Sequence, residues 1–302
     1  MKNQYVGDIG DYGKYSLLRA FANAGVKVGV NWYLTEDDGS TDGKFTKYLE
    51  NDDFSKYDKD VFDALKPIVK KKSKSVKDIQ KSNILPGAVY YPMLLKPIGP
   101  PKERAQQRKD WFEKSMETLS EADLIFMDPD NGLLESEDAS KLGAEKFILP
   151  CEVEEYFSKG KNVVYYCHKG RRKLNDWLSY ISIMANRITD AKPIVLTYHK
   201  GTQRSYIFLI HDKDFPKYRE IIAKFMIKWG SDNTFTEEYT QKGDISAKSV
   251  GEPLVITCDD DRTVTIKQRA DGRIQVEDSR ETNTSHIFEI GHFLSSIGLK
   301  IY

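Results

Sequence analysis

The sequence predicts an α/β protein with a Rossmann-like, mostly parallel sheet and a terminal antiparallel hairpin. One observation is that strand-length apolar runs at 123–128 and 162–168 alternate with segments of helical spacing. That alternation is typical of parallel strands joined by helices. A second observation is a pair of strand-like runs around a glycine-containing turn within 192–211, which predicts antiparallel strands at the end of the sheet.

The composition changes after Gly230 to a polar, turn-rich stretch that is typical of a linker. We therefore expect a Rossmann-like catalytic domain at 1–230 and a small α+β accessory domain at 231–302. In the second domain, residues 254–278 predict three short strands, with Asp271-Gly272 as a hairpin turn. Residues 285–298 have the apolar spacing of an amphipathic helix.

The elements of the first domain follow from apolar spacing and from helix-ending glycines and prolines. Helices are expected at 12–25, within the lysine-rich segment 56–82, at 102–120, near 136–142, at 151–160, at 171–188 and at 217–230. Strands are expected at 26–34, 88–95, 123–128 and 162–168 and in the hairpin 192–211. An acidic loop at 35–44 and a proline-rich loop at 96–101 complete the order.

The charge and cysteine content exclude several classes of protein. Lys+Arg and Asp+Glu are 46 each, so no global positive field attracts nucleic acid, and such binding would need a local patch. The lysine run at 70–77 is most often a solvated surface and only weakly indicates such a patch. Three cysteines without a close pair argue against a disulfide framework or a structural zinc site. Without a signal-peptide pattern or a bilayer-length apolar run, we expect a cytoplasmic protein with no membrane contact.

Candidate catalytic residues follow the predicted strands, because ligands of open α/β sheets bind at the carboxyl ends of parallel strands. The first strand end supplies Asp128, Asp130 and Asn131, and the second supplies His168 and Lys169. Arg171, Arg172, His199, Lys200 and Arg204 are candidate substrate-binding residues beside the second and third strand ends.

These side chains allow more than one chemistry. Asp128 and Asp130 could bind Mg or Mn, or they could orient an amino group or hold a proton. The histidines and cations suit a phosphate or a developing negative charge. A purely structural reading also exists, since Asp-Pro-Asp-Asn-Gly is a good turn sequence and hairpin turns are normally polar.

The N-terminal stretch supplies another set of candidate substrate-binding residues. Asp8, Asp11 and Lys14 alternate with glycines just before a predicted helix, and such glycines let the backbone approach a ligand closely. The spacing is not a dinucleotide fingerprint and no strand precedes it, so a nicotinamide site is rejected.

The strand followed by Asp-Pro-Asp-Asn-Gly resembles the Asp-Pro-Pro-Tyr element of Rossmann-fold methyltransferases that modify exocyclic amines of nucleic-acid bases. The order strand, helix, strand, helix, hairpin is similar to that of the large-subunit ribosomal RNA adenine methyltransferases and related bacterial proteins. The resemblance implies S-adenosylmethionine as cofactor, held near Asp37, Asp38, Gly39 and Gly43. The chain departs from the motif at Asp130 and Asn131, where the family has proline and an aromatic residue that stacks on the flipped base.

Three functions follow as hypotheses. The first is a methyltransferase-like enzyme acting on a nucleic-acid base or nucleotide, with Asp128 orienting the amine. The second is a metal-dependent nuclease or phosphodiesterase, or a glycosyl transferase, with Asp128 and Asp130 as Mg or Mn ligands. The third is a non-catalytic binding protein, and residues 231–302 could contact a protein partner or a second copy of the chain.

Overall fold

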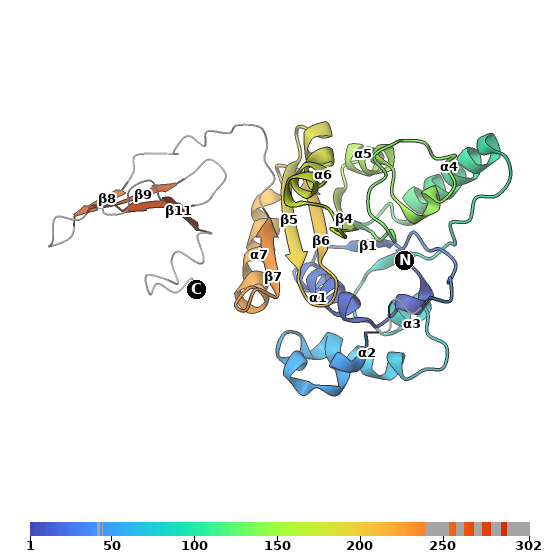
Figure 1. The fold of residues 1–302 in the computed structure, drawn as a ribbon, viewed down its shortest axis with the longest axis horizontal. Coiled ribbons are helices and arrows are strands. Elements are labelled where there is room, and N and C mark those ends of the chain that lie inside the picture. The colour runs from blue at the N-terminus through green and yellow to red at the C-terminus, as the bar shows by residue number, and fades with distance from the viewer. Residues whose placement is uncertain are drawn as a thin grey trace. The chain divides into compact units, whose positions relative to one another are not determined.

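The structure is a computed structural model that describes residues 1–40, 43, 45–238, 254–257, 263–268, 274–278 and 285–288 (Figure 1). The chain divides into two compact units, Met1–Thr240 and Gln241–Tyr302. In the second unit, four antiparallel strands form a sheet in the order β11-β10-β9-β8. Their bounds are β8 (Leu254–Thr257), β9 (Thr263–Gln268), β10 (Ile274–Asp278) and β11 (Ser285–Phe288).

The first unit is built on a seven-stranded mixed sheet in the order β2-β1-β3-β4-β6-β5-β7. The strands are β1 (Val28–Asn31), β2 (Val89–Tyr91), β3 (Leu124–Met127), β4 (Asn162–His168), β5 (Lys192–Tyr198), β6 (Arg204–Ile210) and β7 (Phe235–Glu238). Strands β1 to β4 pair in parallel, whereas β6 is antiparallel to β4 and β5, and β7 is antiparallel to β5. The predicted α/β class is confirmed, and the parallel core followed by a hairpin is consistent with a Rossmann-like sheet.

Seven α-helices lie in the described part of this unit. They are α1 (Ile9–Asn23), α2 (Lys59–Val69), α3 (Val76–Lys81), α4 (Pro101–Thr118), α5 (Pro150–Ser158), α6 (Leu174–Arg187) and α7 (Phe215–Trp229). Local chemistry sets several of their starts. Asp8 caps α1 by accepting a hydrogen bond from the Asp11 amide, and prolines occupy the first positions of α4 and α5. Among the helices that the structure describes, none combines the length and the apolar character that a membrane span requires.

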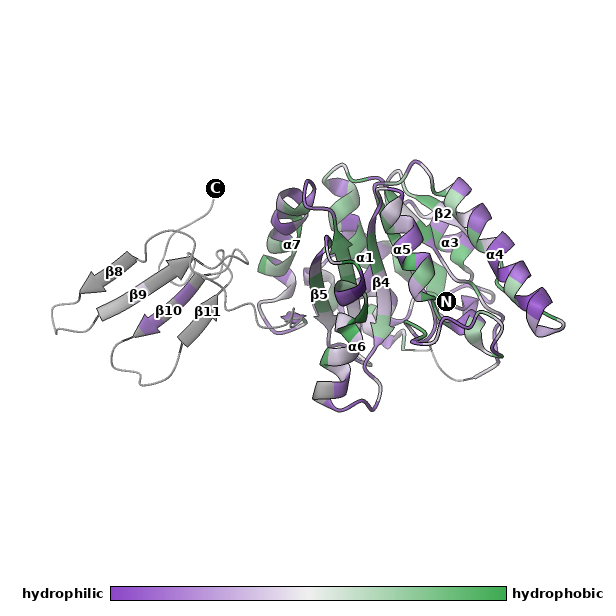
Figure 2. Cartoon of the chain, turned by 90° about the horizontal axis from the view of Figure 1, so that it is seen from above, coloured by the Kyte–Doolittle hydropathy of each residue, from purple (hydrophilic) through white to green (hydrophobic). Residues whose placement is uncertain are grey.

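The sheet has an apolar core on each face, which explains the continuous apolar runs of β3 and β4. On β3, Leu124 and Phe126 pack with α1, α2 and α7, whereas Ile125 and Met127 pack with α4, α5 and α6. Figure 2 shows apolar residues gathered on the strands and on the inner sides of the helices. Because both faces are covered, polar side chains of the central strands gather at the strand ends.

Three sequence-based predictions of secondary structure are wrong. No helix forms at 136–142, because Asp138 accepts hydrogen bonds from the Ser140 amide and hydroxyl and so stabilises a turn. The expected linker after Gly230 contributes β7, which pairs with β5. The start of the helix predicted at 285–298 is strand β11, paired with β10, and residues 289–298 lie outside the described residues.

Two other differences are smaller. The lysine-rich segment 56–82 forms two helices, α2 and α3, instead of one, and a non-helical stretch separates them. The Asp271-Gly272 turn lies outside the described residues, although β9 and β10 pair antiparallel on either side of it.

Candidate functional site

A cavity of about 970 Å³ lies where β3 and β4 end, against the start of α1 and the start of β6. We call it the strand-end cavity. Five separate segments of the sequence line it. They contribute Asp8, Asp11 and Lys14 from the start of the chain, Gly43 and Phe45, Asp128 to Asn131 after β3, Tyr166 and His168 from β4, and Arg204 and Tyr206 from β6. Nine of the seventeen sequence-predicted site residues therefore border one cavity, once Gly43 is included.

Lys14 links two carboxylates at the base of this cavity. Its Nζ lies 2.6 Å from Asp11 Oδ1 and 2.8 Å from Asp128 Oδ2, and all three side chains are at most 5% exposed. Burial opposes the charge on Lys14, but Asp11 and Asp128 outweigh it and raise the pKa of Lys14 well above its usual value. Burial raises the pKa of Asp128, although Lys14 opposes that shift. The result is a buried Asp–Lys–Asp arrangement that joins α1 to the end of β3.

Asp8 and Arg204 form a second ion pair on the cavity wall. Asp8 Oδ2 lies 3.0 Å from Arg204 Nη2, while Asp8 Oδ1 accepts the Asp11 amide at 3.0 Å. A Cβ on Gly10 would lie 2.4 Å from the Arg204 guanidinium, and one on Gly13 would lie 2.9 Å from the Tyr198 ring. These glycines therefore allow close packing against side chains of β5 and β6. The sequence had instead suggested that they let a ligand approach the backbone.

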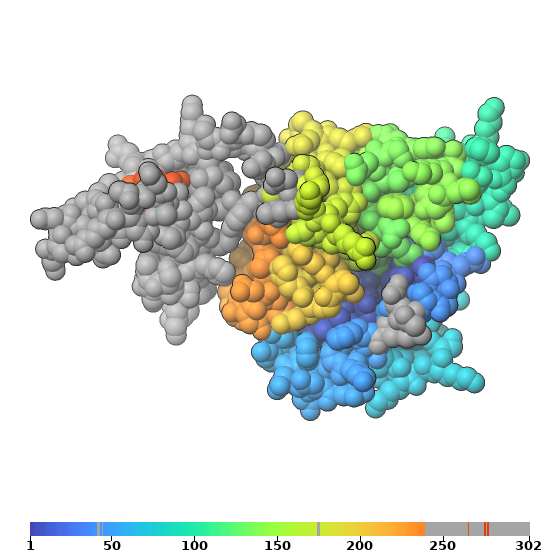
Figure 3. Space-filling model, viewed as in Figure 1, coloured from blue at the N-terminus to red at the C-terminus, as the bar shows by residue number. Residues whose placement is uncertain are grey.

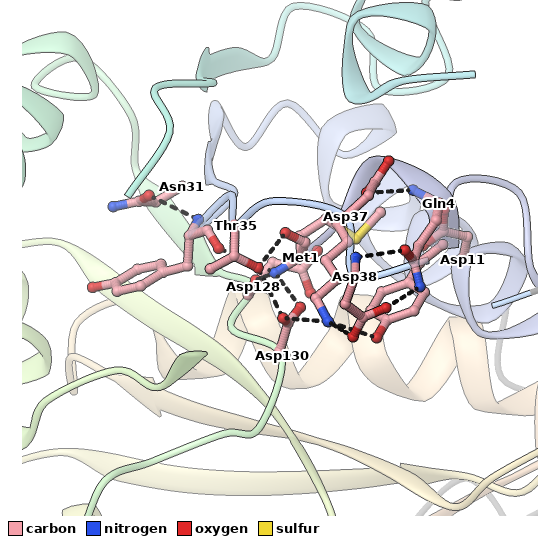
Figure 4. Close-up of polar contacts among 12 residues, drawn as sticks. Met1, Gln4, Asp11, Asn31, Thr35, Asp37, Asp38, Asp128 and Asp130 are labelled. Carbon is pink, nitrogen blue, oxygen red and sulfur yellow. Dashed lines mark hydrogen bonds and ion pairs between the residues drawn. The ribbon is translucent and has the colours of Figure 1, made fainter. Parts of the chain in front are cut away.

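Asp128 and Asp130 have different partners. Asp130 lies 2.8 Å from the Met1 amino group and 3.7 Å from Lys2 Nζ, and it accepts a hydrogen bond from Thr35 Oγ1. The Met1 amino group also donates to the Asp128 backbone carbonyl (Figure 4). Lys14 is thus the side-chain cation paired with Asp128, whereas the Met1 amino group and Lys2 are paired with Asp130. Among the described residues, no group of three or more histidine, cysteine or acidic side chains could hold a metal ion.

The turn after Asp130 is fixed by backbone contacts. The Asn131 amide donates to the Lys146 carbonyl at 2.9 Å, and Gly132 has a φ of 91°. Tyr180 Oη accepts the Leu133 amide and donates to the Leu133 carbonyl. A Cβ on Gly132 would lie 2.6 Å from Cys167 Cβ and 2.8 Å from Tyr180 Oη.

Gly132→Ala is therefore expected to destabilise the protein by about 2 kcal/mol or more, through both backbone strain and overpacking. Gly143→Ala is the matched control, because Gly143 has a φ of 84° but open space where its Cβ would lie. Urea unfolding would measure both variants. Equal losses would show that the packing against Cys167 and Tyr180 contributes nothing.

The end of β4 brings one predicted residue, His168, to the cavity. Burial, followed by the charges of Arg172 and Arg204, lowers the pKa of this half-buried histidine, so the neutral imidazole predominates at pH 7. Lys169, Arg171 and Arg172 do not border the cavity. Arg172 instead lies over the Tyr180 ring, 4.2 Å from its centroid.

Because the pKa of His168 is lower in the folded than in the unfolded state, the unfolded state binds more protons just below the unfolded pKa of about 6.5. Stability is therefore lost as the pH falls from 7 to 5. We expect His168→Gln to make that decline shallower in urea titrations at several pH values. His199→Gln is the comparison, since the pKa of His199 is also lowered by burial but Glu238 opposes the shift. An unchanged slope in His168→Gln would contradict the expectation.

The remaining predicted residues lie elsewhere. His199 contacts Thr236 Oγ1 at 2.7 Å, and neither it nor Lys200 borders the cavity. Asp37 accepts the Gln4 amide, and Asp38 binds Lys2 and the Gln4 side chain. Of the four residues predicted to hold S-adenosylmethionine, Asp37, Asp38, Gly39 and Gly43, only Gly43 borders the cavity. The predicted cofactor residues therefore do not fit that cofactor as a set.

Sequence reasoning missed the aromatic residues of the cavity, which are Tyr5, Phe45 and two tyrosines of the sheet. Tyr166 on β4 and Tyr206 on β6 pair directly across the antiparallel strands, with ring centroids 6.2 Å apart. Tyr206 is 1% exposed, and its hydroxyl has no hydrogen-bond partner among the described residues. The signal was present, since Tyr166 lies two residues before His168 and Tyr206 two residues after Arg204, on the same face of each strand.

Comparisons with known proteins assign no family to the chain. No family model matches the chain, and a search of curated proteins finds no significant match.

Proposed function

We propose that this chain is an enzyme that binds an amine-bearing nucleobase of a nucleotide in the strand-end cavity and transfers a group to that amine. The observation that supports this most is the position of Asp128, a buried carboxylate in a cavity that Tyr166 and Tyr206 also line. A carboxylate accepts hydrogen bonds from an exocyclic amine, and aromatic rings stack on bases.

The two departures from the Asp-Pro-Pro-Tyr motif do not oppose this function. The motif lacks its aromatic residue, but Tyr5, Phe45 and Tyr166 line the same cavity and offer ring surfaces to a base. The extra charge of Asp130 faces the Met1 amino group and Lys2, so it is compensated within the protein. Asp128 is therefore the carboxylate that recognises the amine in this proposal, because Asp130 is already paired with cations of the protein.

The residues of this chain suggest a division of roles. Asp128 would accept a hydrogen bond from the amine, while Lys14 holds that carboxylate in place. Arg204 as a cation and His168 as a neutral hydrogen-bond donor lie on the same cavity and could contact the nucleotide phosphate. Methyl transfer is the reaction class that the resemblance suggests. Since three of the four predicted cofactor residues do not border the cavity, no step is assigned to S-adenosylmethionine.

Calorimetric titration with the four nucleoside monophosphates tests the proposal. We expect saturable binding of the amine-bearing nucleotides, lost in Asp128→Asn but kept in Asp123→Asn. Asp123 is the matched control because it lies at the opposite end of β3, where it accepts the Lys27 amide. Binding that survives Asp128→Asn would overturn the assignment.

Two further titrations with the same variants distinguish the alternatives. Heat from S-adenosylmethionine would establish methyl transfer as the reaction to assay. Manganese binding that requires Asp128, without nucleotide binding, would instead favour the metal-dependent nuclease or glycosyl transferase and overturn our proposal.

Tyr206→Phe is expected to weaken nucleotide binding by about tenfold, because Tyr206 lines the cavity and its hydroxyl has no partner among the described residues that a ligand would have to displace. The melting temperature should not fall, since the variant removes a buried hydroxyl that has no hydrogen bond within the described residues. Tyr165→Phe is the control, as the Tyr165 hydroxyl is also buried and unpartnered there but does not border the cavity. Equal binding by both variants would show that Tyr206 does not contact the ligand.

A further inference from the structure

A segment of high positive charge lies within this electrically neutral chain. Residues 66–81 carry seven lysines and a single acidic residue. The lysines are Lys66, Lys70, Lys71, Lys72, Lys74, Lys77 and Lys81, and the acidic residue is Asp78. Since the whole chain has a net charge of zero, this concentration is a local patch of the kind that binds polyanions. We call it the lysine patch.

Several of these side chains are available for a ligand. Lys70 and Lys72 follow the end of α2, and Lys77 and Lys81 are one turn apart on α3. All four are exposed, and none of them forms an ion pair with a described residue. Lys71 forms an ion pair with Asp78, and Lys66 forms ion pairs with Asp52 and Asp63. The positive charges of Lys70, Lys72, Lys77 and Lys81 are thus not neutralised by carboxylates of the described residues.

The lysine patch and the strand-end cavity share the N-terminal segment 3–8. The Asn3 side chain accepts a hydrogen bond from the amide of Val76, the first residue of α3, at 3.0 Å. Gly7 lies against Val69 at the end of α2, where an added Cβ would be 2.3 Å from Val69 Cγ1. Tyr5 and Asp8 of the same segment line the cavity. Figure 3 shows the blue and cyan lobe that contains α2 and α3 directly beside the dark blue start of the chain.

We infer that the lysine patch binds the phosphate backbone of a single-stranded nucleic acid, one base of which enters the strand-end cavity. This rests on the proposed function and identifies its substrate as a polymer. Lysines along the surface would hold the backbone, and the cavity would take the base. A single strand is favoured because a base in a duplex must first be unstacked before it can enter a pocket.

Fluorescence anisotropy with a labelled single-stranded RNA or DNA of about 15 nucleotides tests this inference. The test variant is Lys70→Gln/Lys72→Gln/Lys77→Gln. The control is Lys213→Gln/Lys217→Gln/Lys228→Gln, which removes the same charge from exposed lysines at or near α7 that do not border the cavity. Each is measured at several salt concentrations, and the nucleoside monophosphate titration is repeated on both.

The patch variant is expected to bind the oligonucleotide about tenfold more weakly, with a salt slope smaller by about 2, because three phosphate contacts are lost. The control should bind as the unmodified protein does. Equal weakening in both variants, or no oligonucleotide binding by the unmodified protein, would overturn the inference. Mononucleotide binding should be unaffected by either set, so its presence or absence judges the proposed function separately.

Discussion

Replacing Asp128 with asparagine is expected to lower turnover of the substrate by about 100-fold or more. Asparagine keeps the shape of the side chain but removes the charge that favours a hydrogen bond from an amine in a buried site. The substitution also places an amide NH₂ in the cavity. That group is a hydrogen-bond donor, so it cannot accept a hydrogen bond from the amine. Asp123→Asn, at the other end of β3, should retain full activity.

The stability of Asp128→Asn decides whether the lower turnover comes from lost chemistry or from unfolding. Lys14 keeps Asp11 at 2.6 Å when Asp128 loses its charge, so the ammonium still has a buried partner. We expect the free energy of unfolding to fall by only about 1–3 kcal/mol, and circular dichroism should show a folded protein at 25 °C. An inactive but folded protein supports the function of Asp128 in the cavity. Full activity would contradict it, and an unfolded variant would assign Asp128 to structure.

The sequence was sufficient to predict the strands that support the site. The bounds of β4 agree with its apolar run, because residues buried on both faces leave a continuous signal. The end of β3, which Asp128 follows directly, was predictable for the same reason. Asp8, Asp11 and Lys14 could be predicted as a group from the glycines between them, although the helix begins at Ile9, earlier than predicted, and includes Asp11 and Lys14.

The partners of these residues could not be predicted from the sequence. The pairing of Lys14 with Asp128 joins positions 114 residues apart, and no local pattern specifies it. Tyr206 reaches the cavity because β6, and not β5, lies next to β4. Both strands of the hairpin are apolar, so periodicity does not distinguish them. The partners of Asp37 and Asp38 could not be predicted either, because Lys2 and Gln4 belong to a segment without a periodic pattern.

Lys14→Met is expected to cause the largest loss of stability, about 3–5 kcal/mol at pH 7. Methionine has a similar length, so the packing against Tyr15 and Trp32 is largely kept while the charge is removed. Asp11 and Asp128 would then lose the ammonium that lies 2.6 and 2.8 Å from them in a buried site. Urea unfolding measures the loss, and Lys213→Met on the surface is the control.

The pH dependence separates this mechanism from a simple packing defect. Burial already raises the pKa of Asp128, and Lys14 is the first of the causes that oppose this shift, so removing Lys14 should raise that pKa further. A buried carboxyl whose pKa is raised on folding destabilises the folded protein when it is ionised. The protein therefore loses stability as the pH rises through the folded-state pKa of that carboxyl. The deficit of Lys14→Met should therefore shrink as the pH falls from 7 to 5.

Adding Asp128→Asn to Lys14→Met should recover part of the lost stability at pH 7, because one uncompensated buried charge is removed. A deficit that does not change with pH and is not reduced in the double variant would mean that Lys14 acts through packing alone. If both effects appear, Lys14 compensates a buried charge on Asp128 that would otherwise destabilise the fold, as expected where a carboxylate is kept ionised for its chemistry.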